Sequence, residues 1–272
     1  AAFAEAADRY GESVALDDRS PRLQYKLGLA RYRAGRLPEA IAALRQAIDL
    51  DPAFAEAHYV LGVCLRGSRQ PEEAVRAMER AVALAPALLA VREELADLYG
   101  AMRRYEARVT HLEALAALQP SAARERALAG GYARAGNLDR AIAQLGGAAK
   151  RYPDDPEIFV TLGRLWLDRA SGGGRVELNK ALEALRGGVA GDSPSEALTL
   201  MGRALLMAGE TARAERILRQ ATLRFPVAPA AYLHLAEAAR RRGRLDTARR
   251  ALRDYAALLP ADAPPAADAR IR

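Results

Sequence analysis

Apolar residues recur along this chain at helical spacing, in a frame that repeats every 34 residues. The stretch "YKLGLARYRAGRLPEAIAALRQAIDLDP" begins at Tyr25, and "YVLGVCLRGSRQPEEAVRAMERAVALAP" begins at Tyr59. Apolar residues three and four apart indicate amphipathic helices. Each repeat contains two such stretches separated by a short polar break, so the pattern predicts a series of helix pairs.

Small residues and helix-ending residues mark fixed places in this frame. Alanine recurs early in the second helix, at Ala40, Ala74, Ala141, Ala181, Ala214 and Ala248. A larger side chain at such a close helix crossing would overpack it, at a cost of about 1–3 kcal/mol. Gly35, Gly136, Gly209 and Gly243 stand where the first helix should end, a frequent place for glycine. Prolines close each repeat because they cannot continue a helix.

This frame resembles the tetratricopeptide repeat, a 34-residue pair of antiparallel helices with Leu-Gly at positions 7 and 8, as in Leu27-Gly28 and Leu61-Gly62. The resemblance implies an all-α, right-handed superhelical solenoid. One repeat cannot bury its apolar face alone, and stacked neighbours cover the rest. We expect seven repeats, over residues 21–54, 55–88, 89–121, 122–155, 156–194, 195–228 and 229–262.

Two repeats depart from the pattern. In the third, either Ala107 or Arg108 could take the tight alanine position. The fifth is longer and contains "SGGGRVE", which suggests a phosphate-binding loop, but it has neither a preceding strand nor a Gly-Lys-Ser/Thr ending. We therefore interpret it as an insertion in the turn within the repeat, mobile and non-catalytic, with an accessory contact left open.

The two ends differ from the repeats between them. Residues 1–20 fit the second helix of a truncated repeat, which leads to the hypothesis that further repeats lie upstream; a mature N-terminus after signal cleavage is the alternative. Residues 263–272 are a Pro/Ala-rich tail. Apolar residues of the last helix, such as Leu252, Leu258 and Leu259, are expected to be partly exposed and available for end-to-end self-contacts.

Composition and charge narrow the choice of partner. The net charge is +7, but 34 acidic residues are interspersed among 41 basic ones, without a block of like charge. At physiological salt, charges are screened over about 8 Å, so the pattern argues against nucleic acid as a partner. The chain has no apolar run long enough to span a membrane. The sequence does not separate a cytoplasmic from a periplasmic location.

Residues that could carry catalysis are few and scattered. His58, His111 and His234 fall at different positions of different repeats, without metal-ligand spacing. Cys64 lies in the apolar stretch "YVLGVCLRG" and is expected to be a buried small hydrophobic residue. We therefore expect no enzymatic activity, no metal and no cofactor.

The family resemblance implies a concave face lined by the first helix of each repeat. Tyrosine and arginine, which often anchor protein interfaces, are frequent there. A lysine and an asparagine that hold a peptide carboxylate in some members are replaced here by Tyr25 and Leu29. The candidate partner-binding residues are Tyr25, Leu29, Tyr32, Arg33, Tyr59, Val63, Arg66, Glu93, Asp97, Arg126, Arg134, Val160, Arg164, Leu167, Arg203, Leu206, Leu233, Glu237 and Arg240.

These residues predict a protein-interaction scaffold that binds a peptide or helix of a partner in the concave groove. Arg126, Arg134, Arg164 and Arg203 suggest an acidic segment of that partner. The alternative is a recruitment or regulatory segment of a larger multidomain enzyme or signalling protein. Nucleic-acid binding by one base per repeat is disfavoured, because the repeats lack a regular pair of base-reading polar residues.

Overall fold

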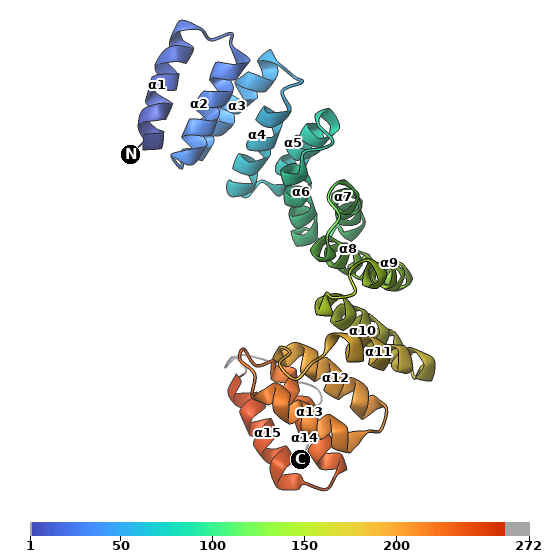
Figure 1. Cartoon of the computed structure of the whole chain (residues 1–272). Coiled ribbons are helices and arrows are strands. Elements are labelled where there is room, and N and C mark those ends of the chain that lie inside the picture. The colour runs from blue at the N-terminus through green and yellow to red at the C-terminus, as the bar shows by residue number, and fades with distance from the viewer. Residues whose placement is uncertain (1, 259–272) are drawn as a thin grey trace. The chain divides into compact units, whose positions relative to one another are not determined.

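The computed structural model describes residues 2–258, which form fifteen α-helices and no strand (Figure 1). The prediction of an all-α fold built from helix pairs is confirmed. In chain order the helices are α1 (Ala2–Leu16), α2 (Pro21–Arg33), α3 (Leu37–Leu50), α4 (Ala55–Gly67), α5 (Pro71–Leu84), α6 (Leu89–Ala101), α7 (Tyr105–Leu118), α8 (Ala122–Arg134), α9 (Leu138–Arg151), α10 (Pro156–Ala170), α11 (Arg175–Gly188), α12 (Ser195–Met207), α13 (Thr211–Thr222), α14 (Pro229–Arg241) and α15 (Leu245–Leu258).

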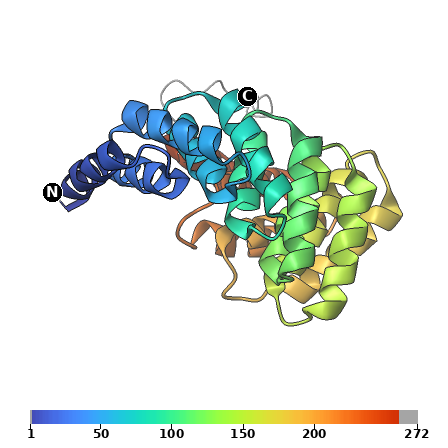
Figure 2. The ribbon, with the colours of Figure 1, turned by 90° about the horizontal axis from the view of Figure 1, so that it is seen from above.

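The helices fall into two compact units, residues 1–124 and 125–272. Each of the seven expected repeat ranges holds two helices, from α2 and α3 in 21–54 to α14 and α15 in 229–262. Helix α1 lies within the range 1–20 and packs against α2. In the first unit, the helices coloured blue to teal stand side by side in chain order in both views (Figure 2).

The core of the first unit lies between the two helices of each repeat and between adjacent repeats. Its main cluster runs from Ala40 and Leu44 of α3 to Leu98 and Tyr99 of α6. A Cβ atom placed on Gly28 of α2 would lie 2.6 Å from Cγ of Leu44, so this crossing requires glycine. The close approach explains why the first helix of this repeat carries Leu-Gly.

The second unit repeats the same packing with its own core. Its main cluster joins α10 to α15 and includes Leu185, Leu218 and Leu235. A Cβ atom on Gly202 of α12 would lie 2.4 Å from Cγ of Leu218 in α13. The same pairing of glycine with a large apolar residue therefore sets the helix crossing in both units.

The turn between the two helices of a repeat contains one residue with a left-handed backbone. Glycine takes this place in five repeats, with φ of 79° at Gly35, 83° at Gly136 and 95° at Gly173. In the second and third repeats the residue is instead an arginine, Arg69 with φ of 59° and Arg103 with φ of 57°. The turn is therefore fixed by its hydrogen bonds and the flanking helices even where the residue is strained in it.

The third repeat places Arg108 at the tight position, which the sequence left open between Ala107 and Arg108. Arg108 is the fourth residue of α7, as Ala40 is of α3. Its guanidinium lies over Gly100 of α6, where an added Cβ would meet Arg108 Nη1 at 3.2 Å. Gly100 thus provides the space that the arginine needs.

The fifth repeat accommodates its extra residues in three places, whereas the sequence analysis placed them all in the turn. Helix α10 has 15 residues, against 13 in α12. The turn comprises Ser171–Gly174, and Arg175 already begins α11. The connection from α11 to α12, residues 189–194, is also longer than the connection 51–54 between α3 and α4. Leu259 and the tail 263–272 lie outside the described residues.

Candidate functional site

Two adjoining pockets form a groove along the first helices of the repeats in the second unit. One pocket of about 650 Å³ lies along α10, α12 and α14, and the other, of about 410 Å³, lies between α8, α10 and α12. Both are lined by Arg164, Pro194 and Glu196, so they are continuous. We call this surface the unit 2 groove. Its further lining residues include Arg126, Glu157, Val160, Asp168, Thr199, Leu200, Arg203, Pro226, Val227 and His234.

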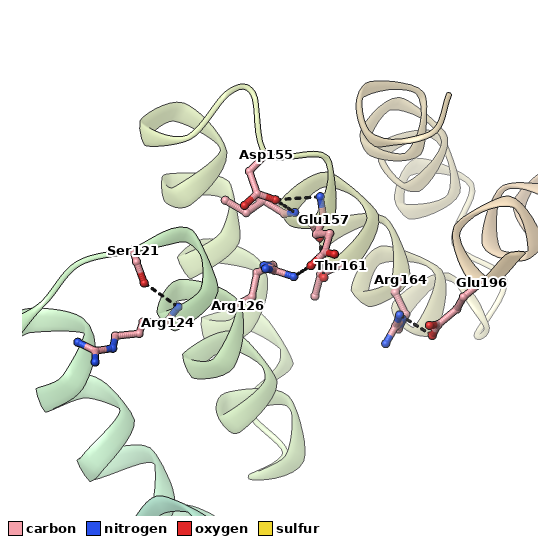
Figure 3. A network of polar contacts seen from close by, with 9 residues as sticks. Ser121, Arg124, Arg126, Asp155, Glu157, Thr161, Arg164 and Glu196 are labelled. Carbon is pink, nitrogen blue, oxygen red and sulfur yellow. Dashed lines mark hydrogen bonds and ion pairs between the residues drawn. The ribbon is translucent and has the colours of Figure 1, made fainter. Parts of the chain in front are cut away.

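Hydrogen bonds around Ser195, at the start of α12, fix one wall of the groove. Its buried hydroxyl donates to the carbonyl of Ala221 at 2.8 Å and accepts from the N–H of Ala228 at 3.0 Å. The loop before α14, which carries Pro226 and Val227, is therefore held against α12. At the other end, Asp155 caps α10 by accepting the N–H of Glu157 at 2.9 Å (Figure 3).

Three arginines that were selected from the sequence for partner binding lie in this groove, and each is paired with a carboxylate on an adjacent first helix. Figure 3 shows the first two of these pairs. Arg126 of α8 pairs with Glu157 of α10. Arg164 of α10 pairs with Glu196 of α12 at 2.8 Å. In the next pair, Arg203 of α12 lies 3.6 Å from Asp168 of α10. The pairs therefore link one repeat to the next.

The groove is consequently balanced in charge. Of the residues between 2 and 258, two arginines and two carboxylates line each of its two pockets. Arg134, at the end of α8, is exposed and lines neither pocket. Arg240 of α14 is bonded to Glu237 on its own helix at 2.9 Å, and these hydrogen bonds lower the pKa of the Glu237 carboxyl.

Aromatic and apolar residues gather on the corresponding helices of the first unit. Tyr25, Leu29 and Tyr32 of α2 and Tyr59 and Val63 of α4 are half-buried and pack against the core cluster. We call them the unit 1 tyrosine patch. Burial raises the pKa of Tyr25 and of Tyr59. Both phenols are therefore neutral at physiological pH and present hydroxyl groups on an apolar surface, a combination frequent in protein interfaces.

Charged residues border this patch. Arg66 of α4 pairs with Glu94 of α6, and Arg124 pairs with Glu93 at 2.9 Å. Arg33 lies 5.5 Å from the centroid of the Phe3 ring, in a cation–π contact. Asp97 is exposed on α6. The residues selected in the first unit therefore lie on its α2, α4 and α6 helices. Arg33, Arg66 and Glu93 already have an ion-pair or cation–π partner within the chain.

Two selected residues are not on the surface. Leu167 is 0% exposed and Leu206 is 5% exposed, and both belong to the core of the second unit. Each is the twelfth residue of its repeat. Its side chain points inward because the first helix packs there against the next repeat. The sequence analysis missed the carboxylates Glu157 and Glu196, which stand at position 2 of their repeats. Glu157 and Glu196 follow Arg126 and Arg164 by 31 and 32 residues, close to one repeat length. This spacing could have predicted an ion pair between the first helices of adjacent repeats.

The histidines and the cysteine occupy separate structural environments. His111 Nε2 lies 3.0 Å from Glu79, which also accepts the hydroxyl of Tyr99 at 2.8 Å. Burial raises the pKa of Cys64 to about 11, so its thiol is neutral. Among the described residues, no group of three or more His, Cys, Asp or Glu side chains is placed to hold a metal ion. None of the helices between residues 2 and 258 combines the length and hydrophobicity needed to cross a bilayer.

Comparisons with solved structures place the fold among helical-repeat proteins. A chain of the Naa15/Naa10 complex bound to HypK-THB aligns over 95% of this chain and 40% of its own, with a TM-score of 0.63 and 19% identity. A TPR repeat-containing protein from Cytophaga hutchinsonii aligns over 86% of this chain and 94% of its own, with a TM-score of 0.62 and 13% identity. YrrB, described as a TPR protein with an unusual peptide-binding site, aligns over 76% and 100%, with a TM-score of 0.53 and 18% identity. This chain thus spans less than half the length of the first of these.

Family models give the more specific result. No curated protein matches the sequence. One tetratricopeptide repeat model matches residues 2–53, 25–88 and 199–263, and a second matches residues 122–165. The two models together cover more than half of the sequence, and their repeats are the helix pairs seen in the structure. The chain therefore belongs to the tetratricopeptide repeat family.

Proposed function

We propose that the chain is a protein-interaction scaffold whose unit 2 groove binds a peptide or helix of a partner protein. The observation that carries this proposal is the continuity of the two pockets, which offer a long concave surface with apolar residues between ion pairs. Concave surfaces of this kind, with a few fixed polar groups, are typical ligand sites. YrrB, a structural neighbour, is described as having a peptide-binding site.

The paired arginines bear on the charge of the partner segment. An acidic segment, as the sequence analysis suggested, has to displace Glu157, Glu196 or Asp168 from its arginine. Exposed ion pairs of this kind contribute at most about 1 kcal/mol each, so the exchange costs little. We therefore propose that an acidic segment of a partner binds in this groove by replacing these carboxylates on their arginines.

The unit 1 tyrosine patch supports the same function with different chemistry. Its half-buried tyrosines present apolar rings and hydroxyl groups at little further cost in side-chain entropy, because packing already restricts them. We propose it as a second contact surface, for an apolar segment of a partner. Tyr25 is held by the ring of Phe54, with centroids 4.9 Å apart.

The groove is tested by selecting binding peptides from a random dodecamer phage library on the purified full chain. Peptide affinities are then measured by calorimetry for Leu200→Arg, which narrows the groove, and for the wild type. We expect at least about a tenfold loss in the variant. Selected peptides that bind Leu200→Arg and the wild type equally would place the binding surface elsewhere.

Charge variants of one ion pair decide the acidic-segment proposal. Glu196→Gln frees Arg164 and should strengthen binding of an acidic selected peptide, whereas Arg164→Glu should weaken it. The double variant Arg164→Glu, Glu196→Arg keeps an ion pair at the same place and serves as the matched control for folding. If selected peptides carry no acidic excess and ignore Glu196→Gln, the acidic partner is excluded for this groove.

A further inference from the structure

A third pocket of the second unit opens on the opposite side of α12 from the unit 2 groove. Its volume is about 410 Å³, and α12 contributes Leu198, Met201 and Leu205 to it. The groove instead uses Glu196, Thr199, Leu200 and Arg203 of the same helix. Successive residues of a helix are about 100° apart, so these two sets face in opposite directions. The remaining lining residues are Val189, Ala190, Gly191, Arg213, Arg216, Ile217 and Gln220.

The long connection between α11 and α12 forms one wall of this pocket. The N–H of Ala190 donates to the hydroxyl of Ser193 at 2.8 Å, which closes a turn. The guanidinium of Arg224, just after α13, donates to the carbonyl of Gly191 and holds this turn. The wall is therefore fixed at both sides, and the space between it and α13 remains open over an apolar floor.

The floor is apolar and the charged groups at the rim are positive. Val189 and Ile217 are half-buried over the fully buried Leu198. Among the described residues, Arg213 and Arg216 of α13 are the charged side chains that line the pocket, and no carboxylate lines it. Arg213 has a partner, Glu210, at 2.5 Å. Arg216 is exposed and has no ion-pair partner among residues 2–258.

This positive lining differs from that of the unit 2 groove, where arginines and carboxylates are equal in number. An unbalanced arginine beside an apolar floor recognises a carboxylate attached to an apolar group. More apolar surface adjoins the wall, because Arg224 is flanked by Leu223 and Phe225, which are 84% and 96% exposed. Exposed large apolar side chains in succession are uncommon on a surface without a partner.

We propose that this pocket, which we call the outer pocket, is a further docking site, which binds an acidic amphipathic segment of a partner protein. One large apolar side chain of that segment enters over Ile217 and Val189, and a neighbouring carboxylate pairs with Arg216. The site is independent of the unit 2 groove, because the two are on opposite sides of α12. The scaffold can therefore hold two segments at once.

The test uses a fluorescein-labelled peptide, DELFDE, and the full chain. Fluorescence anisotropy is expected to show saturable binding that weakens on the order of tenfold in Arg216→Glu, because a charge pair becomes a repulsion. Ala190→Trp, which fills the mouth of the pocket from an exposed loop, should weaken binding to a similar extent. Arg76→Glu, at the equivalent exposed position of α5 in the first unit, is the matched control and should leave the affinity unchanged.

Two further peptides separate the contributions of charge and apolar surface. KKLFKK replaces the acidic residues and DESSDE replaces the apolar ones, and both should bind at least about tenfold more weakly than DELFDE. Circular dichroism melting confirms that each variant is folded. Absence of binding at about 1 mM peptide, equal binding of KKLFKK, or unchanged affinity in both Arg216→Glu and Ala190→Trp would each overturn the proposal. Loss of binding in Arg164→Glu instead would assign the peptide to the groove of the proposed function.

Discussion

At the scale of single residues, the most demanding feature is a buried carboxylate in the second unit. Glu215 of α13 is 1% exposed. Its oxygens accept from Arg219 at 2.6 Å, from Arg242 at 2.6 Å and from Arg244 at 3.1 Å. A buried charge is tolerated only when it is paired and hydrogen-bonded, and here the partners come from the next repeat as well as from the same helix.

We predict that Glu215→Ala lowers the free energy of unfolding by about 1–3 kcal/mol. The value is below that for a fully buried pair, because the three arginines are partly exposed and regain water when the carboxylate is removed. Urea denaturation followed by circular dichroism measures the change. Glu237→Ala, which removes a carboxylate bonded to exposed arginines of its own helix, is the control and should cost less than about 1 kcal/mol. Equal losses in the two variants would contradict the argument.

The residues of the candidate site were only partly predictable from the sequence. Position in the repeat gave Arg126, Arg164 and Arg203 a common direction, because helical periodicity fixes the direction of a side chain, and all three line the unit 2 groove. It gave Leu167 the same direction, although packing against the next repeat buries this residue. The ion pairs between repeats and the outer pocket both depend on the spacing of helices in neighbouring repeats. The sequence of a single repeat does not determine that spacing.

At the scale of helices and turns, the repeat frame was a strong guide. Glycine at the left-handed position and proline at the first turn of a helix act locally, so the helix ends follow from the sequence. The fifth repeat shows the limit, because its extra residues extend α10 and a connection as well as the turn. Once a helix has started, adding residues to it keeps hydrogen bonds that a longer loop would lose, and this preference is not visible in the glycine run itself.

The arginines in left-handed turns give a prediction at this scale. Arg69→Gly should stabilise the chain by about 1 kcal/mol, because a non-glycine residue with positive φ is strained by about 1–2 kcal/mol and the entropy of glycine offsets part of the gain. Thermal unfolding by circular dichroism measures the shift. Gly35→Arg, at the equivalent turn of the first repeat, is the matched reverse change and should destabilise by a similar amount. If Arg69→Gly lowers the melting temperature, contacts of the arginine side chain outweigh the backbone strain.

At the scale of the whole molecule, each unit has a core of its own. Leu44 lies in the main cluster of the first unit and Leu218 in that of the second, and both are fully buried. In a repeat protein, stability is approximately a sum of repeat and neighbour contributions, so a mutation acts most strongly on its own surroundings. The single tryptophan, Trp166, packs against the core of the second unit and reports on that unit alone.

We therefore predict that the two units respond separately to core mutations. Leu218→Ala should move the midpoint of urea unfolding followed by tryptophan fluorescence to lower urea, because a Leu→Ala change in a core costs about 2–5 kcal/mol. Leu44→Ala is the matched variant in the first unit, and it should leave the fluorescence midpoint unchanged while it shifts part of the circular dichroism transition. If both variants move the fluorescence midpoint equally, the chain unfolds as one cooperative unit, and a partner bound in the second unit would also stabilise the first. With separate responses, ligand binding to the unit 2 groove or the outer pocket stabilises the second unit only.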